Sequence, residues 1–167
     1  MSSDQESKVT VEIVEFKQKY AKQFRDINYA WLQKYFSIEP YDRIVLEDPH
    51  GQIIAHGGHI LLAEAAGEIL GVCALLKQTD LKFELAKMGV LDGYQGHGIG
   101  RCLAEAAITK ARSLGAATLV LATSRSLIAA NHLYHNLGFR EVDRSEIGPL
   151  PYKRESIVMA LDLLQDQ

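Results

Sequence analysis

The segment from Phe83 to Arg101 constrains the fold of this chain more than any other. It reads FELAKMGVLDGYQGHGIGR, an apolar-rich run followed by a glycine-rich loop, and apolar residues then recur at helical spacing through Leu114. The first turn of a helix presents N–H groups that have no partner inside the helix, and glycines let an anion approach this backbone closely. The segment therefore predicts a strand over 82–90, a pyrophosphate-binding loop, and a helix over 97–114.

Glycine spacing separates three kinds of phosphate loop. A P-loop requires four residues between its glycines followed by Lys-Ser or Lys-Thr, which the segment lacks. A dinucleotide loop requires G-x-G-x-x-G and an acid at the end of the next strand, whereas the spacing from Gly96 is G-x-G-x-G and the strand over 118–123 ends in Ala-Thr-Ser. The pattern that fits is Q-x-x-G-x-G from Gln95 to Gly100, followed by a basic residue.

This loop is similar to the acyl-CoA loop of the GCN5-related N-acetyltransferases (GNAT). A second segment, SLIAANHLYHNLGFR from Ser126 to Arg140, also resembles the family. Its matching residues are Ala130, Leu133, Tyr134, Leu137, Gly138 and Phe139. The early WLQKYF…EPYDR stretch and the ELAKM sequence resemble bacterial acetyltransferase domains of the kind found fused to MarR-type regulators.

The periodicity along the chain predicts an α/β fold. Strands are expected at Val9–Phe16, Ile53–His56, His59–Ala65, Ile69–Lys77, Lys82–Val90, Thr118–Thr123, Phe139–Arg144 and Ser156–Leu163. Helices are expected over Lys17–Phe36, Glu39–Leu46, 97–114 and around Tyr134, with a turn at Asp48–Gly51. Without the short 53–56 strand the order is β-α-α-β-β-β-α-β-α-β-β, which is also the order of the GNAT family. We expect a mixed, largely antiparallel sheet of six to seven strands flanked by about four helices.

The length and composition indicate one soluble domain over residues 1–167, with 1–8 as a flexible N-terminus. A net charge of −3 disfavours nucleic acid as a partner, and no apolar run reaches the length of a membrane span. The polar N-terminus and two cysteines, Cys73 and Cys102, favour free thiols and a cytoplasmic location. Exposed strand edges make a homodimer possible.

The family resemblance implies acetyl-CoA as the co-substrate and assigns residues to it. The edge formed by Met88, Gly89 and Val90 would pair with the pantetheine amides, and the N–H of Val90 would stabilise the oxyanion. The loop residues that would contact the pyrophosphate are Gln95, Gly96, His97, Gly98, Ile99, Gly100 and Arg101. Asn131 is a further candidate contact. Leu127 stands where the family often has an asparagine, and either Ser124 or Asn131 could replace that contact.

Two side chains are candidates for the chemistry. Glu84, on the strand that leads to the loop, could take a proton from the amine, or it could be a solvated strand residue beside Lys82 or a partner of Lys87. Simple alternation would place Glu84 on one face with Met88 and Val90, and Lys87 on the opposite face. Tyr134 corresponds to the family tyrosine that donates to the coenzyme sulfur, although an aromatic residue packed on a helix face is the alternative.

The resemblance places the acceptor pocket between the two early helices and a late loop. Trp31, Tyr35, Glu39 and Tyr152 are its candidate residues, and core packing is an equally good interpretation of the aromatic ones. Acids there would suit a cationic amine, whereas Arg154 or Arg43 could hold a carboxylate. The histidines, including the pairs His56/His59 and His132/His135, lack ligand spacing, so no metal is expected.

Together these features predict an acetyl-CoA-dependent N-acetyltransferase that moves an acetyl group directly to a primary amine of a small molecule or peptide. The mechanism would be sequential, because neither cysteine is placed near the loop as a nucleophile. A non-catalytic acyl-CoA-binding or sensing domain is the first alternative. A nucleotide-binding oxidoreductase domain is the second, and the glycine spacing weighs against it.

Overall fold

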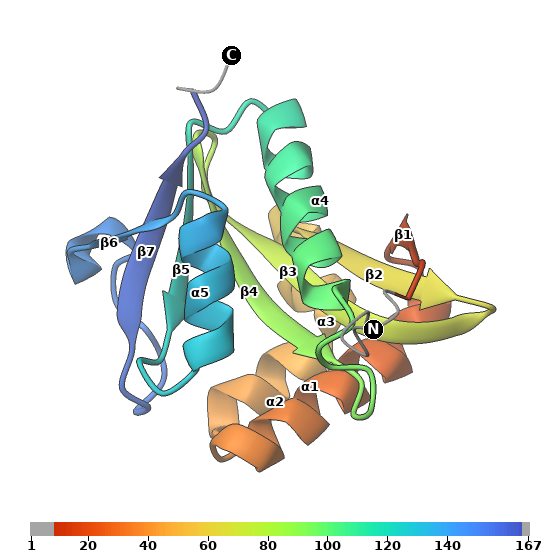
Figure 1. Ribbon diagram of the computed structural model, residues 1–167. Helices are drawn as coiled ribbons and strands as arrows, with labels where there is room; N and C mark the ends of the chain where they lie inside the picture. Colours follow the sequence, from red (N-terminus) through yellow and green to blue (C-terminus); the bar gives the residue numbers. More distant parts are fainter. Residues whose placement is uncertain (1–8, 165–167) are drawn as a thin grey trace, which may run out of the picture.

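The computed structural model describes residues 9–164, which form one seven-stranded sheet with helices on both faces (Figure 1). The predicted flexible N-terminus, 1–8, lies outside the described residues. The strands are β1 (Glu12–Glu15), β2 (His59–Ala65), β3 (Glu68–Thr79), β4 (Lys82–Val90), β5 (Thr118–Thr123), β6 (Arg140–Val142) and β7 (Ile157–Asp162). The α-helices are α1 (Ala21–Tyr35), α2 (Pro40–Leu46), α3 (Pro49–Gln52), α4 (Ile99–Ser113) and α5 (Ile128–Asn136). The predicted mixed α/β class is confirmed.

The strand order in the sheet is β1-β2-β3-β4-β5-β7-β6, and every neighbouring pair is antiparallel except β4 with β5. The parallel pair is short: Lys82–Glu84 align with Thr118–Val120, and no later residues of these strands pair. Beyond this point β4 and β5 separate, as Figure 1 shows. The sheet is therefore split at its centre, between the two strands that precede α4 and α5.

The two faces of the sheet carry separate cores. On one face α4 packs against β2, β3 and β4, and its Leu103 shares a core with Tyr134 of α5. On the other face α1 packs against β3 and β4, and its Phe24 shares a core with Leu46 of α2. The amphipathic patterns of 17–36 and 97–114 correspond to these buried faces, which explains why the sequence identified both helices.

A β-bulge interrupts β4 opposite Cys73. Val72 pairs with Gly89 but Ala74 pairs with Ala86, so one more residue of β4 than of β3 lies in this interval. Lys87, in the bulge, has a φ of 55°, the left-handed region that a non-glycine residue rarely adopts. The bulge reverses the alternation of side chains along the rest of the strand.

The bulge makes one sequence prediction wrong. Met88 and Val90 lie with Phe83 and Leu85 on the α4 face, instead of sharing a face with Glu84. Lys87 points to the opposite face, where it contacts α2, instead of joining Phe83 and Leu85. Strict alternation fails because it assumes one residue of β4 for each residue of β3.

The segment between α2 and β2 also differs from the prediction. The Asp48–Gly51 turn is the start of α3: the Asp48 carboxylate accepts a hydrogen bond from the Gly51 N–H at 3.1 Å, and Pro49 occupies the first turn. Ile54–His56 forms a 3-10 turn that ends at Gly57, whose φ is 85°. The predicted strand at Ile53–His56 is therefore wrong, since helical hydrogen bonds already engage this backbone.

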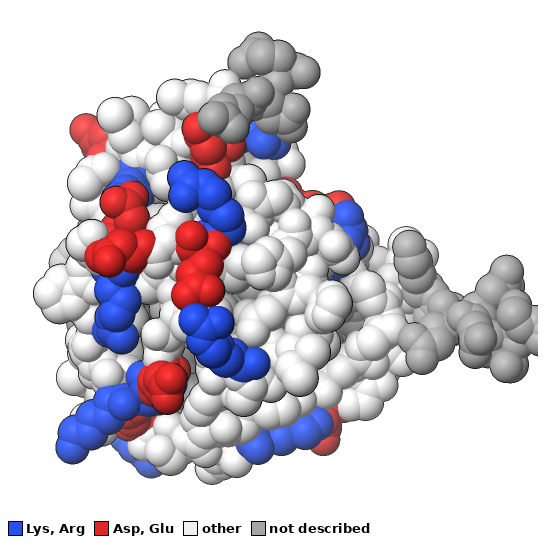
Figure 2. All heavy atoms as spheres, turned by 60° about the vertical axis from the view of Figure 1, so that its left-hand side comes forward, with Lys and Arg blue, Asp and Glu red and all other residues white. Residues whose placement is uncertain are grey.

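The outer strands are shorter than their hydrophobic patterns suggested. β1 covers only Glu12–Glu15 of the predicted 9–16, and β6 covers only Arg140–Val142 of 139–144. On the face in Figure 2, Lys and Arg alternate with Asp and Glu, without an extended patch of one sign. Within residues 9–164, no helix is both long and apolar enough to cross a bilayer.

Candidate functional site

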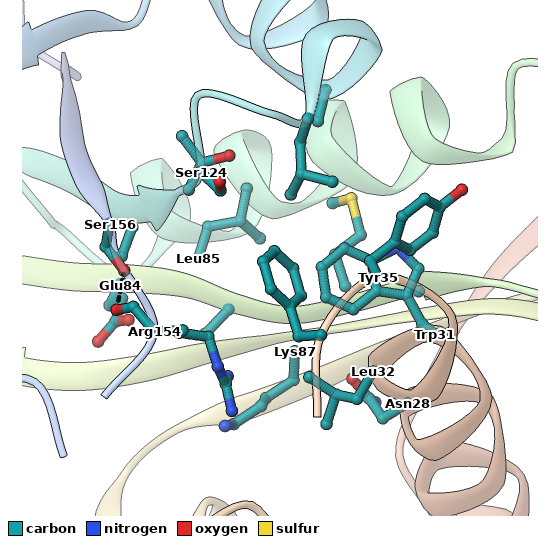
Figure 3. A pocket seen from close by; sticks show the side chains of 18 of the residues that line it. Asn28, Trp31, Leu32, Tyr35, Glu84, Leu85, Lys87, Ser124, Arg154 and Ser156 are labelled. Carbon is teal, nitrogen blue, oxygen red and sulfur yellow. Dashed lines mark hydrogen bonds between the residues drawn. The ribbon is translucent and has the colours of Figure 1, made fainter. Parts of the chain in front are cut away.

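A cavity of about 790 Å³ opens where β4 and β5 separate. Its walls are β4, the end of β5, and the first turns of α4 and α5 on one side, and α1, α2 and the 147–156 segment on the other. The cavity is one continuous space that runs from the glycine loop to the early helices. Figure 3 shows it at the level of Glu84 and Lys87.

The glycine loop forms one end of this cavity. Gly96 and Gly98 have φ values of 84° and 85°, and Gly98 is the N-cap of α4. The first intrahelical hydrogen bond runs from the Cys102 N–H to the Gly98 carbonyl at 3.1 Å. The N–H groups of residues 99–101 therefore have no acceptor within α4, and these residues line the cavity. Such N–H groups, with the positive end of the helix dipole, can bind a pyrophosphate.

Two side chains attach this loop to its neighbours. Lys34, near the end of α1, contacts both the Asp92 carboxylate at 3.2 Å and the Gln95 side-chain oxygen at 3.3 Å. The Gln95 nitrogen reaches the Val90 carbonyl at 3.5 Å. Gln95 thus links α1 to the end of β4, and Lys34 adds a cation beside the loop that the sequence did not single out. Arg101 is paired with Glu105 at 3.2 Å.

The end of β4 offers a backbone N–H to the cavity. The Leu91 N–H donates to the Leu70 carbonyl at 2.8 Å, and Val90 is the residue paired with Gly71. Because an antiparallel ladder alternates between pairs that exchange hydrogen bonds and pairs that do not, the N–H and C=O of Val90 point away from β3. The Val90 C=O is reached by the Gln95 side chain, and the Val90 N–H is available to an extended chain lying between β4 and β5.

Glu84 lies on β4 where the parallel pairing to β5 ends. Its carboxylate receives a long hydrogen bond of 3.4 Å from the Gln78 side chain. Burial raises the pKa of Glu84 above its usual value, while Lys87 and the Gln78 contact lower it. A carboxylate with a raised pKa is a stronger base than an ordinary glutamate.

Tyr134 lies on the opposite wall, on α5. Its ring packs edge-on against Phe139, with centroids 5.8 Å apart, and its side chain is 9% exposed. Burial raises the pKa of Tyr134 to about 12. The phenol therefore stays protonated throughout the neutral range and can donate a hydrogen bond into the cavity.

Aromatic side chains line the end of the cavity at the early helices. Trp31 packs against Tyr35 and Phe36 with centroid distances of 5.4 and 5.5 Å. Tyr41 and Tyr152 meet edge to face at 5.8 Å, which joins α2 to the late loop. All five residues line the cavity and provide an aromatic wall, and Trp31 and Phe36 also pack against the core.

A cluster of charged residues lies beneath this aromatic wall. Asp42, on α2, is 1% exposed and contacts both Arg154 and Lys87. Arg154 also donates to the Glu39 carboxylate at 3.2 Å and stacks at 4.2 Å from the Tyr152 ring centroid. Lys87 donates to the Tyr152 hydroxyl and lies 4.7 Å from its ring centroid. Burial has the largest effect on the pKa of Tyr152 and raises it, and the Asp42 carboxylate raises it further.

Comparison with known proteins identifies this arrangement. Residues 20–139 match the acetyltransferase (GNAT) family. The chain belongs to the GNAT family. The split between β4 and β5, the glycine loop and Tyr134 all lie within the matched region.

The GNAT relatives include characterised and uncharacterised proteins. YvbK of Bacillus subtilis (strain 168), an uncharacterized N-acetyltransferase, is 36% identical over 105 residues, which is 61% of this chain and 68% of YvbK. N-acetylaspartate synthetase of Danio rerio is 33% identical over 96 residues, or 57% of this chain, and the match spans only 34% of that enzyme.

Solved GNAT structures share the fold over nearly the whole chain. An acetyltransferase of Staphylococcus aureus Mu50 superposes with a TM-score of 0.81 at 22% identity, covering 92% of this chain and 99% of that one. A Bacillus subtilis acetyltransferase solved in complex with CoA has a TM-score of 0.69 at 24% identity, covering 93% and 100%. At these identities the likeness concerns the fold alone.

Most residues predicted for the GNAT site lie together along the cavity. The lining residues are Trp31, Tyr35, Glu84, Met88, Gly89, Val90, Gln95, Gly96, Gly98, Ile99, Gly100, Arg101, Tyr134 and Tyr152. Three predicted residues, Glu39, His97 and Asn131, are not among the lining residues. Their predicted contacts with substrate or coenzyme stay predictions.

Local hydrogen bonds explain two of these three placements. Glu39 begins α2 with a capping box and accepts hydrogen bonds from the Lys153 N–H and from Arg154, so it holds the late loop against α2. The Asn131 side chain donates to the Ser124 carbonyl at 2.9 Å, which fixes α5 to the end of β5. Leu127, which stands where the family often has asparagine, lines the cavity and precedes α5 without a side-chain cap.

The two cysteines are not placed for covalent catalysis in this GNAT domain. Cys73 is completely buried, and burial raises its pKa to about 12. Cys102 is exposed on α4 and is not among the lining residues. Among residues 9–164, no group of three or more His, Cys, Asp and Glu side chains could hold a metal ion.

Proposed function

We propose that this GNAT domain transfers an acetyl group from acetyl-CoA to a primary amine. The observation that carries the proposal is the single cavity that contains free amides of the glycine loop, the Val90 backbone, Glu84 and Tyr134. These are the groups that direct acyl transfer requires: a grip on the donor, an oxyanion donor, a base and a donor to the leaving sulfur. The name of the zebrafish relative, N-acetylaspartate synthetase, is consistent with an amine acceptor.

The loop and β4 would hold the coenzyme. The N–H groups of Gly98, Ile99, Gly100 and Arg101 would bind the pyrophosphate, and the edge of β4 from Met88 to Val90 would bind the pantetheine arm as an added strand. The arm would then lie in the gap between β4 and β5. This direction brings the thioester toward Glu84 and Tyr134.

Glu84 would act as the general base. A free alkylamine has a pKa near 10, so only about one molecule in a thousand is neutral at pH 7. The carboxylate would take the proton, directly or through a water, as the nitrogen attacks the thioester carbon and the C–S bond breaks. The Val90 N–H supports the developing oxyanion.

Tyr134 would stabilise the departing sulfur. With a pKa of about 12, the phenol is a weaker acid than a thiol, whose ordinary pKa is about 8.5. Its contribution is therefore a hydrogen bond to the thiolate, and complete proton transfer is not required. Because neither cysteine is placed to attack the thioester, we propose a sequential mechanism through a ternary complex.

Release of free CoA thiol and acetylated product, measured across an amine panel, tests the function. Intersecting double-reciprocal plots are expected for a ternary complex. Saturable acetyl-CoA binding without thiol release in the presence of any amine would instead indicate a non-catalytic acyl-CoA-binding domain. Gly98→Trp, which places a large side chain in the loop, should abolish the binding itself.

A further inference from the structure

Lys87 carries a buried ammonium group at the end of the cavity formed by α1 and α2. None of the steps proposed above uses this group. Its side chain is 11% exposed, and Lys87 is among the residues that line the cavity. The bulge, with its φ of 55° at Lys87, turns this side chain to the face of β4 that carries Glu84. Figure 3 shows Glu84 and Lys87 on one side of the strand and Leu85 on the other.

The contacts around Lys87 leave its charge incompletely compensated. It donates to the neutral Tyr152 hydroxyl, and the Asp42 Oδ1 atom is 3.8 Å away, beyond hydrogen-bonding distance. The other Asp42 oxygen is already used by Arg154 and by the Glu39 N–H. Asp42 Oδ1 itself has no hydrogen bond. A buried ammonium with this surrounding can accept a further anion as a direct partner.

Lys87 also determines which amines can approach Glu84. Glu84 and Lys87 affect each other's protonation, since Lys87 lowers the pKa of Glu84 and Glu84 raises that of Lys87. A simple alkylammonium bound at Glu84 would experience repulsion from Lys87, because two like charges close together in a partly buried site repel each other. A zwitterion avoids this repulsion by placing its own carboxylate on Lys87.

We propose that the acceptor is an α-amino acid, whose carboxylate is held by Lys87 while its amine lies beside Glu84. The proposal rests on the acetyltransferase function above and names the acceptor class. An α-amino acid carries an amine and a carboxylate on one carbon, and Glu84 and Lys87 present a base and a cation from one face of β4. The aromatic wall of Trp31, Tyr35 and Phe36 is then available to the amino-acid side chain.

The other charged groups around Lys87 are consistent with this role. Burial lowers its pKa most, and Arg154 lowers it further, whereas Asp42 and Glu84 raise it. A substrate carboxylate would add a third acidic neighbour and favour the charged ammonium. Arg154 stays engaged with Glu39 and Asp42, so it positions the Asp42 carboxylate without needing to contact the substrate.

Matched pairs of acceptors test the proposal in the unmodified protein. Phenylalanine with phenethylamine, glutamate with γ-aminobutyrate, and alanine with ethylamine each compare an α-amino acid with the amine lacking its α-carboxylate. With acetyl-CoA saturating, kcat/KM for the best-accepted amino acid should exceed that of its partner by about 10- to 100-fold, the value of one charge-assisted hydrogen bond. Equal or better use of the decarboxylated amines would overturn the proposal.

Variants identify the residue responsible. Lys87→Met should remove most of this preference by raising KM for the amino acid, whereas Lys87→Arg should keep the preference. The control Lys22→Met removes a surface charge and should leave kcat/KM unchanged for both the amino acid and the decarboxylated amine. The proposal would also be overturned if Lys87→Met lowered kcat/KM equally for both members of each pair while its melting temperature and acetyl-CoA affinity stayed unchanged. Transfer without a carboxylate preference thus refutes this inference alone, whereas absence of transfer to every amine refutes the proposed function as well.

Discussion

Glu84 and Lys87 project from the same face of β4, although three positions separate them in a strand. The bulge at Lys87 makes this possible, and the positive φ of that residue is its local conformational cost. As a result, the predicted base and a buried cation both face α2 and the 147–156 segment, while Met88 and Val90 face α4. The bulge thus separates groups for the acceptor from groups on the other side of the sheet.

Replacing Glu84 by glutamine should remove the acidic limb of the pH–rate profile. Burial raises the pKa of Glu84, so kcat/KM of the unmodified protein should fall as the pH decreases through this raised pKa and the base becomes protonated. Glu84→Gln should lower the rate by about 10²- to 10⁴-fold at neutral pH and flatten this limb. An unchanged rate at neutral pH would exclude Glu84 as the base. Glu141→Gln, on the exposed strand β6, is the control.

Glu84→Gln should not lower the stability of the domain at neutral pH and should increase it at higher pH. Because folding raises the pKa of this carboxyl, its ionised form is disfavoured in the folded state. The glutamine variant should therefore gain stability relative to the unmodified protein at pH 8, and the gain should shrink as the pH falls toward the pKa of the unfolded chain. Urea unfolding at several pH values measures this difference.

Gly98→Ala should weaken coenzyme binding while Gly93→Ala should not. Both glycines have positive φ, 85° and 90°, so an alanine at either should cost about 1 kcal/mol of unfolding free energy. Gly98 lines the cavity as the N-cap of α4, whereas Gly93 does not line it and a Cβ there would meet no atom within 4 Å. Calorimetric titration with acetyl-CoA should show about tenfold weaker binding for Gly98→Ala alone. Equal affinities of the two variants would contradict the assigned pyrophosphate site.

Tyr134→Phe should lower kcat without changing acetyl-CoA affinity. Removing a hydrogen bond to a developing thiolate should cost about 10- to 100-fold in rate. Since the pKa of Tyr134 is about 12, the unmodified enzyme should show no loss of activity from this group below about pH 11. Tyr20→Phe is a matched control, because Tyr20 is equally buried but packs in the core on the other face. A full rate in Tyr134→Phe would assign the residue to packing against Phe139.

The sequence located the glycine loop better than the charged cluster at the other end of the cavity. Gln95 to Gly100 are adjacent in the chain, so their spacing carried the geometry of the loop, and the amphipathic pattern located α4 behind it. Asp42 and Arg154 are far apart in the sequence, and their contact depends on how the late loop packs on α2. The side-chain direction of Lys87 depends on a single extra residue in β4, which an alternating pattern does not reveal.

The contact of Arg154 with Asp42 should stabilise the domain more than a surface ion pair does. Asp42 is 1% exposed, so Arg154→Ala would leave a buried carboxylate whose only cationic partner among residues 9–164 is Lys87, at 3.8 Å. We expect a loss of about 3 kcal/mol in unfolding free energy, measured by urea denaturation. Arg125→Ala is the matched control: its contact with Glu141 is exposed and should contribute less than about 1 kcal/mol. The double variant Arg154→Ala/Asp42→Asn should recover part of the lost unfolding free energy, because it removes the unpaired charge. Equal destabilisation by Arg154→Ala and Arg125→Ala would show that the buried pair contributes no more than the exposed one.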